Sequence, residues 1–185
     1  MNPYTLALFA HFVGLVALFV GYGLEWSATS LLRRSSNADQ ARSWLRIYKL
    51  SLPVSGPGLL LLILSGGFMA SVTGSMKQGW ISASLLAIVF ALGIGFVFIL
   101  PRIKRIRAAL PEGNAPLSDA ILARLQDPMI VTLIRVRFLL AIGIVYLMTA
   151  KTDTLSTSLF ILLGAIVLGL LCAIGAWTSR PNAKA

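Results

Sequence analysis

Ionisable side chains gather on one face of the first apolar segment of the chain. At 100° per residue, Tyr4, His11, Tyr22 and Glu25 fall within about 40° of one line, and Leu18 interrupts this stripe. Because ionisable groups are costly in hydrocarbon, the stripe is expected to face the interior of a helical bundle. His11 is the only histidine of the chain, and Glu25 is the first carboxylate. These two residues are therefore the first candidates for chemistry.

The imidazole of His11 suggests a cofactor site. Neutral imidazole binds haem iron, copper and other metals, and methionine is a second ligand in some of these sites. Met69 and Met148 are expected near the outer ends of their helices, on the same side of the membrane as His11. The three residues form a candidate site for haem or for Cu(I). Two alternatives stay open: a structural histidine beside methionines that only pack, and a histidine that handles protons or contacts a quinone.

Glu25 suggests an ion pair inside the bundle. It lies near the expected cytoplasmic end of its helix, and Arg135 and Arg137 begin a later apolar segment from the same side. The two arginines are about 200° apart on a helix, so only one of them can face the core. We expect a structural pair between Glu25 and that arginine. A proton or ion relay through Glu25 is the alternative.

Other catalytic and metal-binding patterns are missing from the sequence. It contains no second histidine, no pair of carboxylates within an apolar segment, no glycine-rich phosphate loop and no Ser-His-Asp set. One Cys and one His cannot supply the four ligands of a structural zinc site. Cys172 lies within an apolar segment and is expected to be inert. We therefore predict no catalytic residues and lean away from an enzyme.

The composition requires that these residues lie in a membrane. Of 185 residues, 57% are hydrophobic and 12% are charged, whereas a soluble domain has about 25% charged residues. Four segments are long and apolar enough to cross a bilayer. A fifth does so if its two arginines reach the interface with their long side chains; otherwise it is an interfacial segment. The sequence predicts an all-α bundle, a single membrane domain with five spans at about 5–25, 57–75, 80–101, 129–150 and 155–178.

The basic residues predict the orientation of these spans. With five spans, 14 of the 16 Lys and Arg residues fall on one side, including Arg180 and Lys184 of the tail, and only Lys77 and Lys151 fall on the other. The positive-inside rule then places the N-terminus outside and the C-terminus in the cytoplasm. The first span lacks a preceding basic region and is expected to be a reversed signal anchor. The net charge of +10 is attributed to orientation and to contact with membrane lipid, not to nucleic acid.

The cytoplasmic loops are expected to hold short interfacial helices. Asn37 can cap a helix over 38–50, which we expect to lie flat on the inner leaflet, and Ser118 can cap another over 119–126. In the last span, Ala165, Gly169 and Ala173 recur at every fourth position. Such small residues allow close helix approach. Packing within the chain and a homodimer through this stripe are both open.

Several short motifs resemble a family of small uncharacterised bacterial integral-membrane proteins. They lie at 10–14 (AHFVG), 41–46 (ARSWLR), 64–69 (LSGGFM), 100–105 (LPRIKR) and 146–151 (YLMTAK). This family is similar in turn to the copper-resistance D and membrane protoporphyrinogen-oxidase-like groups, whose first helix carries an LH-x-x-G motif; Ala10 replaces the Leu here. The resemblance to the oxidase group implies a haem ligand at His11. The second ligand of that group, a lysine in the third helix, has no counterpart over 78–101.

Three functions follow as expectations. The first is a non-catalytic accessory or scaffold protein of the bacterial inner membrane. The second is a haem- or metal-binding redox protein centred on His11. The third is a small transporter or proton-coupled carrier that uses Glu25. A colourless, metal-free preparation would argue against the second, and inverted repeats with broken helices are typical of the third.

Overall fold

The structure of the protein is a computed structural model that describes residues 2–113 and 115–178. These residues form helices, with no strand beyond an isolated bridge between Asn37 and Pro116. Five of the helical stretches are long and apolar enough to cross a membrane, which confirms the predicted all-α bundle of five spans. The tail residues Arg180 and Lys184 lie outside the described residues. The elements in chain order are α1 (Pro3–Leu32), α2 (Ala38–Val72), η1 (Ser75–Lys77), α3 (Gly79–Gly93), η2 (Ile94–Ile99), α4 (Leu100–Ala109), α5 (Asp119–Leu125), α6 (Pro128–Ala150) and α7 (Leu155–Thr178).

The long helices extend past the expected spans at one end of the bundle. At 1.5 Å per residue, the 30 residues of α1 and the 35 of α2 exceed the roughly 30 Å of a hydrocarbon core. Segment 38–50 is not the separate surface helix that the sequence suggested, because it is the first part of α2. That helix continues through Pro53 and Pro57, since prolines are tolerated within spanning helices. The second expected helix is present as α5.

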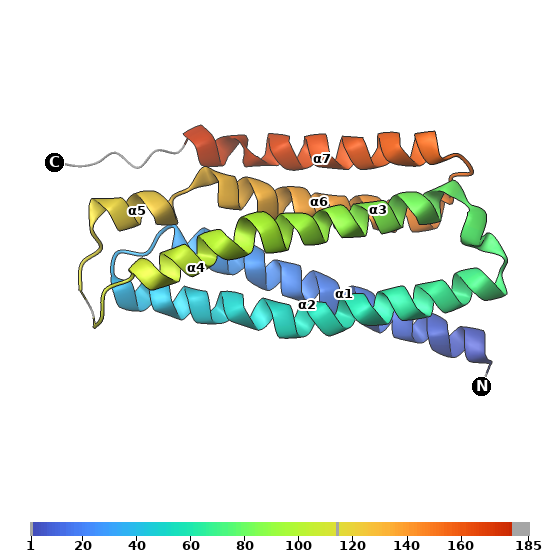
Figure 1. Ribbon diagram of the computed structural model, residues 1–185, viewed down its shortest axis with the longest axis horizontal. Helices are drawn as coiled ribbons and strands as arrows, with labels where there is room; N and C mark the ends of the chain where they lie inside the picture. The colour runs from blue at the N-terminus through green and yellow to red at the C-terminus, as the bar shows by residue number, and fades with distance from the viewer. Residues whose placement is uncertain (1, 114, 179–185) are drawn as a thin grey trace.

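The helices form two groups that diverge toward one end (Figure 1). α1 packs chiefly on α2, and α6 packs on α7 and on α3. α6 is the central helix: 61% of the most apolar stretch of its span is buried, against 17–33% in the other four spans. α1 begins at one end of the long axis, and α7 ends at the other. The two groups meet mainly at the end where α4 and α5 lie.

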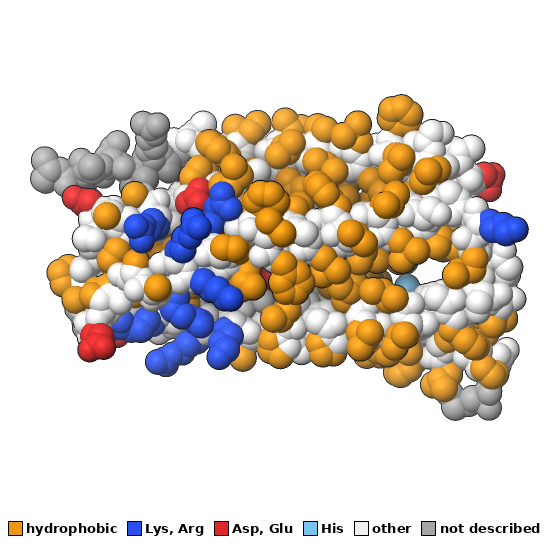
Figure 2. All heavy atoms as spheres, viewed as in Figure 1, with side chains coloured by type: hydrophobic (Ala, Val, Ile, Leu, Met, Phe, Trp, Pro, Cys, Tyr) orange, Lys and Arg blue, Asp and Glu red, His pale blue; other side chains and the backbone are white. Residues whose placement is uncertain are grey.

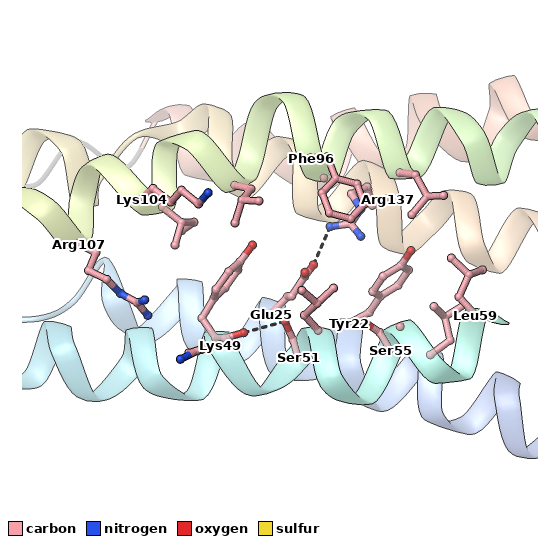
Figure 3. A pocket seen from close by; sticks show the side chains of 18 residues that line it. Tyr22, Glu25, Lys49, Ser51, Ser55, Leu59, Phe96, Lys104, Arg107 and Arg137 are labelled. Carbon is pink, nitrogen blue, oxygen red and sulfur yellow. Dashed lines mark hydrogen bonds and ion pairs between the residues drawn. The ribbon is translucent and has the colours of Figure 1, made fainter. Parts of the chain in front are cut away.

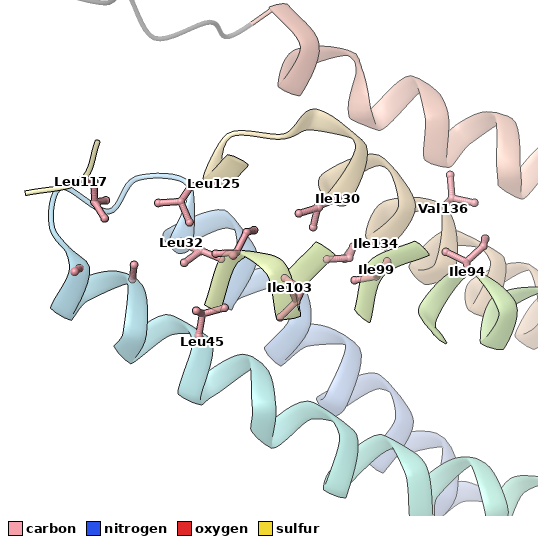
Figure 4. Close-up of a cluster of buried hydrophobic side chains, with 13 residues drawn as sticks. Leu32, Leu45, Ile94, Ile99, Ile103, Leu117, Leu125, Ile130, Ile134 and Val136 are labelled. Atoms are coloured by element: carbon pink, nitrogen blue, oxygen red, sulfur yellow. The ribbon is translucent and has the colours of Figure 1, made fainter. Parts of the chain in front are cut away.

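A hydrophobic cluster joins the two groups at that end (Figure 4). Leu45 of α2, Ile99 of η2 and Ile134 of α6 are each at most 3% exposed within it. The cluster also takes in Leu125 of α5 and Leu32 at the end of α1. Because residues 38–45 bury their apolar side chains here, the first turns of α2 stay helical and stand beside α4 instead of lying flat.

The two groups are held internally by small residues. A Cβ added to Gly14 would lie 2.7 Å from the carbonyl oxygen of Gly58, and one added to Gly21 would lie 2.5 Å from the Cβ of Ser55. In lipid, no hydrophobic effect drives two helices together, so close packing of their backbones at small residues stabilises the contact instead. The contact between α1 and α2 is therefore a seam without room for larger side chains.

The small-residue stripe of α7 faces α6. A Cβ added to Gly169 would lie 2.7 Å from the Cα of Val136, and Ala165 closely approaches Gly143. Ala173 is 1% exposed. The stripe is thus in use within the chain. The homodimer through these residues stays a prediction, and it would require α7 to separate from α6.

Candidate functional site

A cavity of about 310 Å³ lies between the two helix groups (Figure 3). Its walls come from α1, α2, α3, η2, α4 and α6. Its polar and charged lining consists of Tyr22, Glu25, Tyr48, Lys49, Ser51, Ser55, Lys104, Arg107 and Arg137. The remaining lining consists of Leu18, Leu52, Gly56, Leu59, Leu92, Gly95, Phe96, Leu100 and Ile103. The volume is at the lower end of that of small-molecule sites, which is about 300–1,000 Å³.

A buried ion pair forms the inner wall of the cavity. Arg137 Nη1 donates to Glu25 Oε2 over 2.9 Å, and each side chain is only 10% exposed. The guanidinium lies 4.9 Å from the centre of the Tyr22 ring, in cation–π geometry. Either charge alone would be costly at this depth, so each residue makes the other tolerable.

The other arginine of the fourth span, Arg135, makes its contacts outside the cavity. Arg135 lies 5.3 Å from the centre of the Trp26 ring and donates to the carbonyl oxygen of Cys172 on α7. The angular separation of the two arginines explains this division, because only Arg137 faces the cavity. Of the two partners that the sequence offered for Glu25, the structure uses Arg137.

Gly95 makes room for the ion pair. It belongs to η2, a π-helical stretch that widens the third span over Ile94–Ile99. A Cβ added to Gly95 would lie 3.2 Å from Cζ of Arg137, tighter than ordinary van der Waals contact. π-helical turns inside α-helices are frequent at functional sites. Here the turn presents Gly95 and Phe96 to the cavity.

Three cations lie at one end of the cavity, which we call the mouth: Lys49 of α2 and Lys104 and Arg107 of α4. Figure 3 shows these side chains on one side of Glu25, with Leu59 at the opposite end. Within the described part of the chain, the Arg107 guanidinium donates one hydrogen bond, a long one of 3.5 Å to the carbonyl oxygen of Leu45. The cavity thus has a cationic end and an apolar end, separated by the ion pair.

His11 lies outside the lining of this cavity and contacts α2. Its Nδ1 is 3.1 Å from Ser65 Oγ, and its Cε1 lies against Gly66. Ser65 donates its hydroxyl proton to the carbonyl oxygen of Leu61 over 2.5 Å, so Ser65 Oγ accepts from Nδ1–H. The resulting tautomer leaves Nε2 with a lone pair. His11 is therefore a partly buried histidine with one satisfied nitrogen.

The structure does not bring the proposed cofactor ligands into one site. Met69 is on α2, one turn beyond Ser65, but Met148 packs against the apolar cluster of α3, α6 and α7. In the described ranges, no three His, Cys, Asp or Glu side chains gather in a way that could hold a metal. Met69 and Met148 therefore lie in different helix groups, and a haem or Cu(I) site centred on His11 stays a prediction.

The sequence carries no signal for the mouth residues beyond their charge. Lys49, Lys104 and Arg107 are there only basic residues that flank the spans. The spacing of Lys104 and Arg107 places them on one face of a helix, but the sequence does not show that this face meets Lys49. Nothing in the sequence indicates the π-helical turn that brings Gly95 to Arg137.

The family of the chain is decided by its residues 5–152. They match the model of a family described as "Predicted integral membrane protein (DUF2269)". The chain belongs to this family. The match runs from α1 to the end of α6, so it includes every residue that lines the cavity. No curated protein and no solved structure matches the chain.

Membership confirms the resemblance to small integral-membrane proteins and the multi-pass membrane class of this protein. The further likeness to the copper-resistance D and oxidase-like groups stays a prediction. The family description names no activity, so the function must be argued from the cavity itself.

Proposed function

We propose that this protein is a multi-pass protein of the bacterial inner membrane that binds an amphiphilic molecule without transforming it. The observation that carries the proposal is the division of the cavity into a cationic mouth and an apolar far end, with the ion pair between Glu25 and Arg137 between them. Ligand sites are mostly apolar, with a few polar groups that fix orientation. A molecule with an anionic head and a hydrocarbon tail matches both ends.

The walls of the cavity support binding from the bilayer. Leu52 is 57% exposed and Phe96 is 54% exposed, so the rim consists of apolar side chains that face the surrounding medium. A tail that leaves the bilayer at this rim meets Leu59 and Leu92 next. It stays in contact with apolar surface throughout, so entry involves little loss of hydrophobic stabilisation.

The orientation of the protein belongs to the same proposal. Figure 2 shows Lys and Arg gathered toward the end of the bundle where α4 and α5 lie, and hydrophobic side chains over the middle. The positive-inside rule then places the mouth on the cytoplasmic side and the start of α1 outside.

Cysteine accessibility tests this orientation in a Cys172→Ala background. Met76 is exposed in η1, and Glu112 is exposed between α4 and α5. In spheroplasts, a membrane-impermeant maleimide is expected to label Met76→Cys and to spare Glu112→Cys. Labelling of Glu112→Cys alone would reverse the orientation.

Photo-crosslinking tests ligand binding. A fatty acid with a diazirine in its tail is incorporated into membranes that contain the whole chain, and labelled peptides are mapped. Gly56 lines the cavity, and a Cβ added there meets nothing within 4 Å, so the indole of Gly56→Trp is expected to occupy part of the cavity. Label on peptides from α2 and η2 is expected to fall severalfold in this variant.

Gly67→Trp is the matched control. Gly67 is also on α2, also has nothing within 4 Å of an added Cβ, and does not line the cavity. Its labelling is expected to equal that of the unsubstituted protein. Equal labelling of Gly56→Trp and Gly67→Trp would overturn the proposal.

A second candidate function is a proton-coupled carrier, favoured by the position of Glu25. Its carboxylate lines the cavity at membrane depth, where ionisable groups commonly mark ion pathways. In vesicles loaded with a pH dye, proton entry that requires an added fatty acid is expected to disappear in Glu25→Gln, while crosslinking persists. Proton entry that is unchanged in Glu25→Gln would remove this candidate.

A further inference from the structure

We propose that the ligand of the cavity is a phospholipid whose headgroup ends in a phosphate monoester and which enters from the cytoplasmic leaflet. This inference rests on the proposed function, because it names the chemical class of the amphiphile. Three features support it: the positive charges of the mouth, the lack of acidic partners for these charges, and the exposed apolar rim of the cavity at Leu52 and Phe96.

The cavity has an excess of positive charge. Its lining holds four cations and one carboxylate, and that carboxylate, Glu25, is already paired with Arg137. Lys49, Lys104 and Arg107 remain. A phosphate monoester carries about 1.5–2 negative charges at neutral pH, a phosphodiester carries one, and a phosphatidylcholine headgroup has no net charge. Three cations at one end of the cavity therefore favour the monoester.

The mouth cations have no acidic partner among the described residues. Within residues 2–113 and 115–178, the recorded ion pairs join Arg42 to Asp39, Arg102 to Asp127 and Arg137 to Glu25. None of these pairs includes a mouth cation. Three like charges at one opening repel one another in the empty protein, so an anion bound between them relieves that repulsion.

The arrangement suits a phosphate. Lys104 and Arg107 are three residues apart on α4 and share a face, and Lys49 approaches from α2 on the opposite side. Arg binds phosphate oxygens through a planar fork, and Lys acts as a point charge. Basic pockets between spanning helices on the cytoplasmic side are a recognised form of lipid headgroup site.

The apolar walls distinguish a lipid from a soluble phosphate. Leu52 and Phe96 stand at an exposed rim, and Leu59 lies at the far end from the cations. A free phosphate would leave this apolar space without a partner, whereas a lipid would fill it with an acyl chain. The cavity therefore fits a headgroup and part of a chain, with the rest of the lipid left in the bilayer.

Native mass spectrometry of the whole chain, released from detergent with added lipid, tests the inference. The probes are dioleoyl phosphatidic acid, phosphatidylglycerol and phosphatidylcholine with the same chains, and glycerol 3-phosphate. Phosphatidic acid is expected to bind at least about tenfold more tightly than phosphatidylglycerol, and glycerol 3-phosphate is expected not to compete.

Charge-matched variants locate the site. Lys49→Gln, Lys104→Gln and Arg107→Gln together are expected to reduce phosphatidic acid binding at least about tenfold. Arg46→Gln, Arg105→Gln and Arg124→Gln together remove the same charge from exposed residues that do not line the cavity, and binding is expected to be retained. An equal loss in both triple variants would overturn the inference, because the preference would then reflect overall charge.

The remaining outcomes separate this inference from the proposed function. If phosphatidylcholine or phosphatidylglycerol binds as tightly as phosphatidic acid, the preference for a phosphate monoester headgroup is overturned. If Gly56→Trp still blocks crosslinking in that case, the proposal that the cavity binds an amphiphile is retained. If glycerol 3-phosphate competes fully, the site is one for a soluble phosphate and the lipid assignment is overturned. If no lipid binds and Gly56→Trp leaves crosslinking unchanged, both proposals fail.

Discussion

The two ends of the bundle are built on different principles. At the end formed by α4 and α5, a hydrophobic cluster joins α1 and α2 to the other helices. The buried ion pair between Glu25 and Arg137 lies next to this cluster, toward the middle of the bundle. At the opposite end the two groups diverge (Figure 1), and Figure 2 shows a hollow between them. There the polar contact recorded for His11 stays within the α1–α2 pair. The charged groups that could bind a ligand are therefore at the end where the helix groups are joined.

The first candidate from the sequence, a cofactor site at His11, belongs to the diverging end and stays a prediction. The only histidine suggested a site near the outer ends of the helices, but its contacts are those of a packed residue. The cavity instead forms where one carboxylate, two tyrosines and several cations converge from different helices.

The ion pair is expected to contribute most of all single contacts at the joined end. Glu25→Ala leaves Arg137 buried without its carboxylate and is expected to lower the free energy of unfolding by about 3–5 kcal/mol. Asp39→Ala is the control, because its pair with Arg42 is largely exposed and is expected to contribute less than about 1 kcal/mol. Equilibrium unfolding in mixed micelles measures both. Similar losses in the two variants would show that the buried pair has no special role.

The combined variant sharpens this prediction. Glu25→Leu with Arg137→Met removes both charges and keeps apolar bulk, so much of the lost stability is expected to return. A combined variant that is as unstable as Glu25→Ala would mean that packing around these positions, and not their charge, accounts for the loss.

The seam between α1 and α2 is expected to give the next largest effect. Gly21→Ala forces a Cβ to within 2.5 Å of Ser55 and is expected to cost about 1–3 kcal/mol by overpacking. Gly23→Ala is the matched control, since nothing lies within 4 Å of its added Cβ and alanine favours the helix. Thermal unfolding in detergent compares them. A Gly23→Ala variant that is as unstable as Gly21→Ala would show that the close approach of α1 to α2 at Gly21 does not account for the loss of stability.

Gly95→Ala is expected to have a smaller effect on stability. The added Cβ must push the guanidinium of Arg137 by a few tenths of an ångström, at a cost of about 1 kcal/mol. Gly93→Ala is the control, because its added Cβ meets nothing within 4 Å. Thermal unfolding and phosphatidic acid binding are measured for both. If the two variants behave alike, Gly95 does not position the ion pair.

His11→Ala is expected to have the smallest effect on the cavity. It removes one hydrogen bond to Ser65 and is expected to cost about 0.5–1.5 kcal/mol. Fatty-acid crosslinking in the cavity is expected to be unchanged, because His11 is not among the lining residues. A severalfold loss of crosslinking in this variant would mean that the two ends of the bundle are coupled.

The sequence predicts much of the fold because lipid restricts the choices. Charge-free segments of sufficient length must be spanning helices, and α5 appears where Ser118 marks its start. Helical periodicity also shows that only one of Arg135 and Arg137 can face the core. The sequence therefore limits the partner of Glu25 to Arg135 or Arg137, and the structure shows that it is Arg137.

The rest could not be predicted, because periodicity gives the face of a helix but not its neighbour. Lys49 and Lys104 are 55 positions apart in the chain, and only tertiary packing places them at one opening. The continuous α2 likewise depends on the cluster that buries Leu45. Segment 38–50 alone reads as an amphipathic surface helix, because the sequence does not contain the helices that cover it.

The most direct test of the account is an experimental structure of the protein in lipid nanodiscs that contain phosphatidic acid. The account predicts elongated density between α2 and η2, with its head within hydrogen-bonding distance of Lys104 and Arg107 and its tail beside Leu59. A cavity that contains only water, or one closed by contact between α2 and η2, would contradict it.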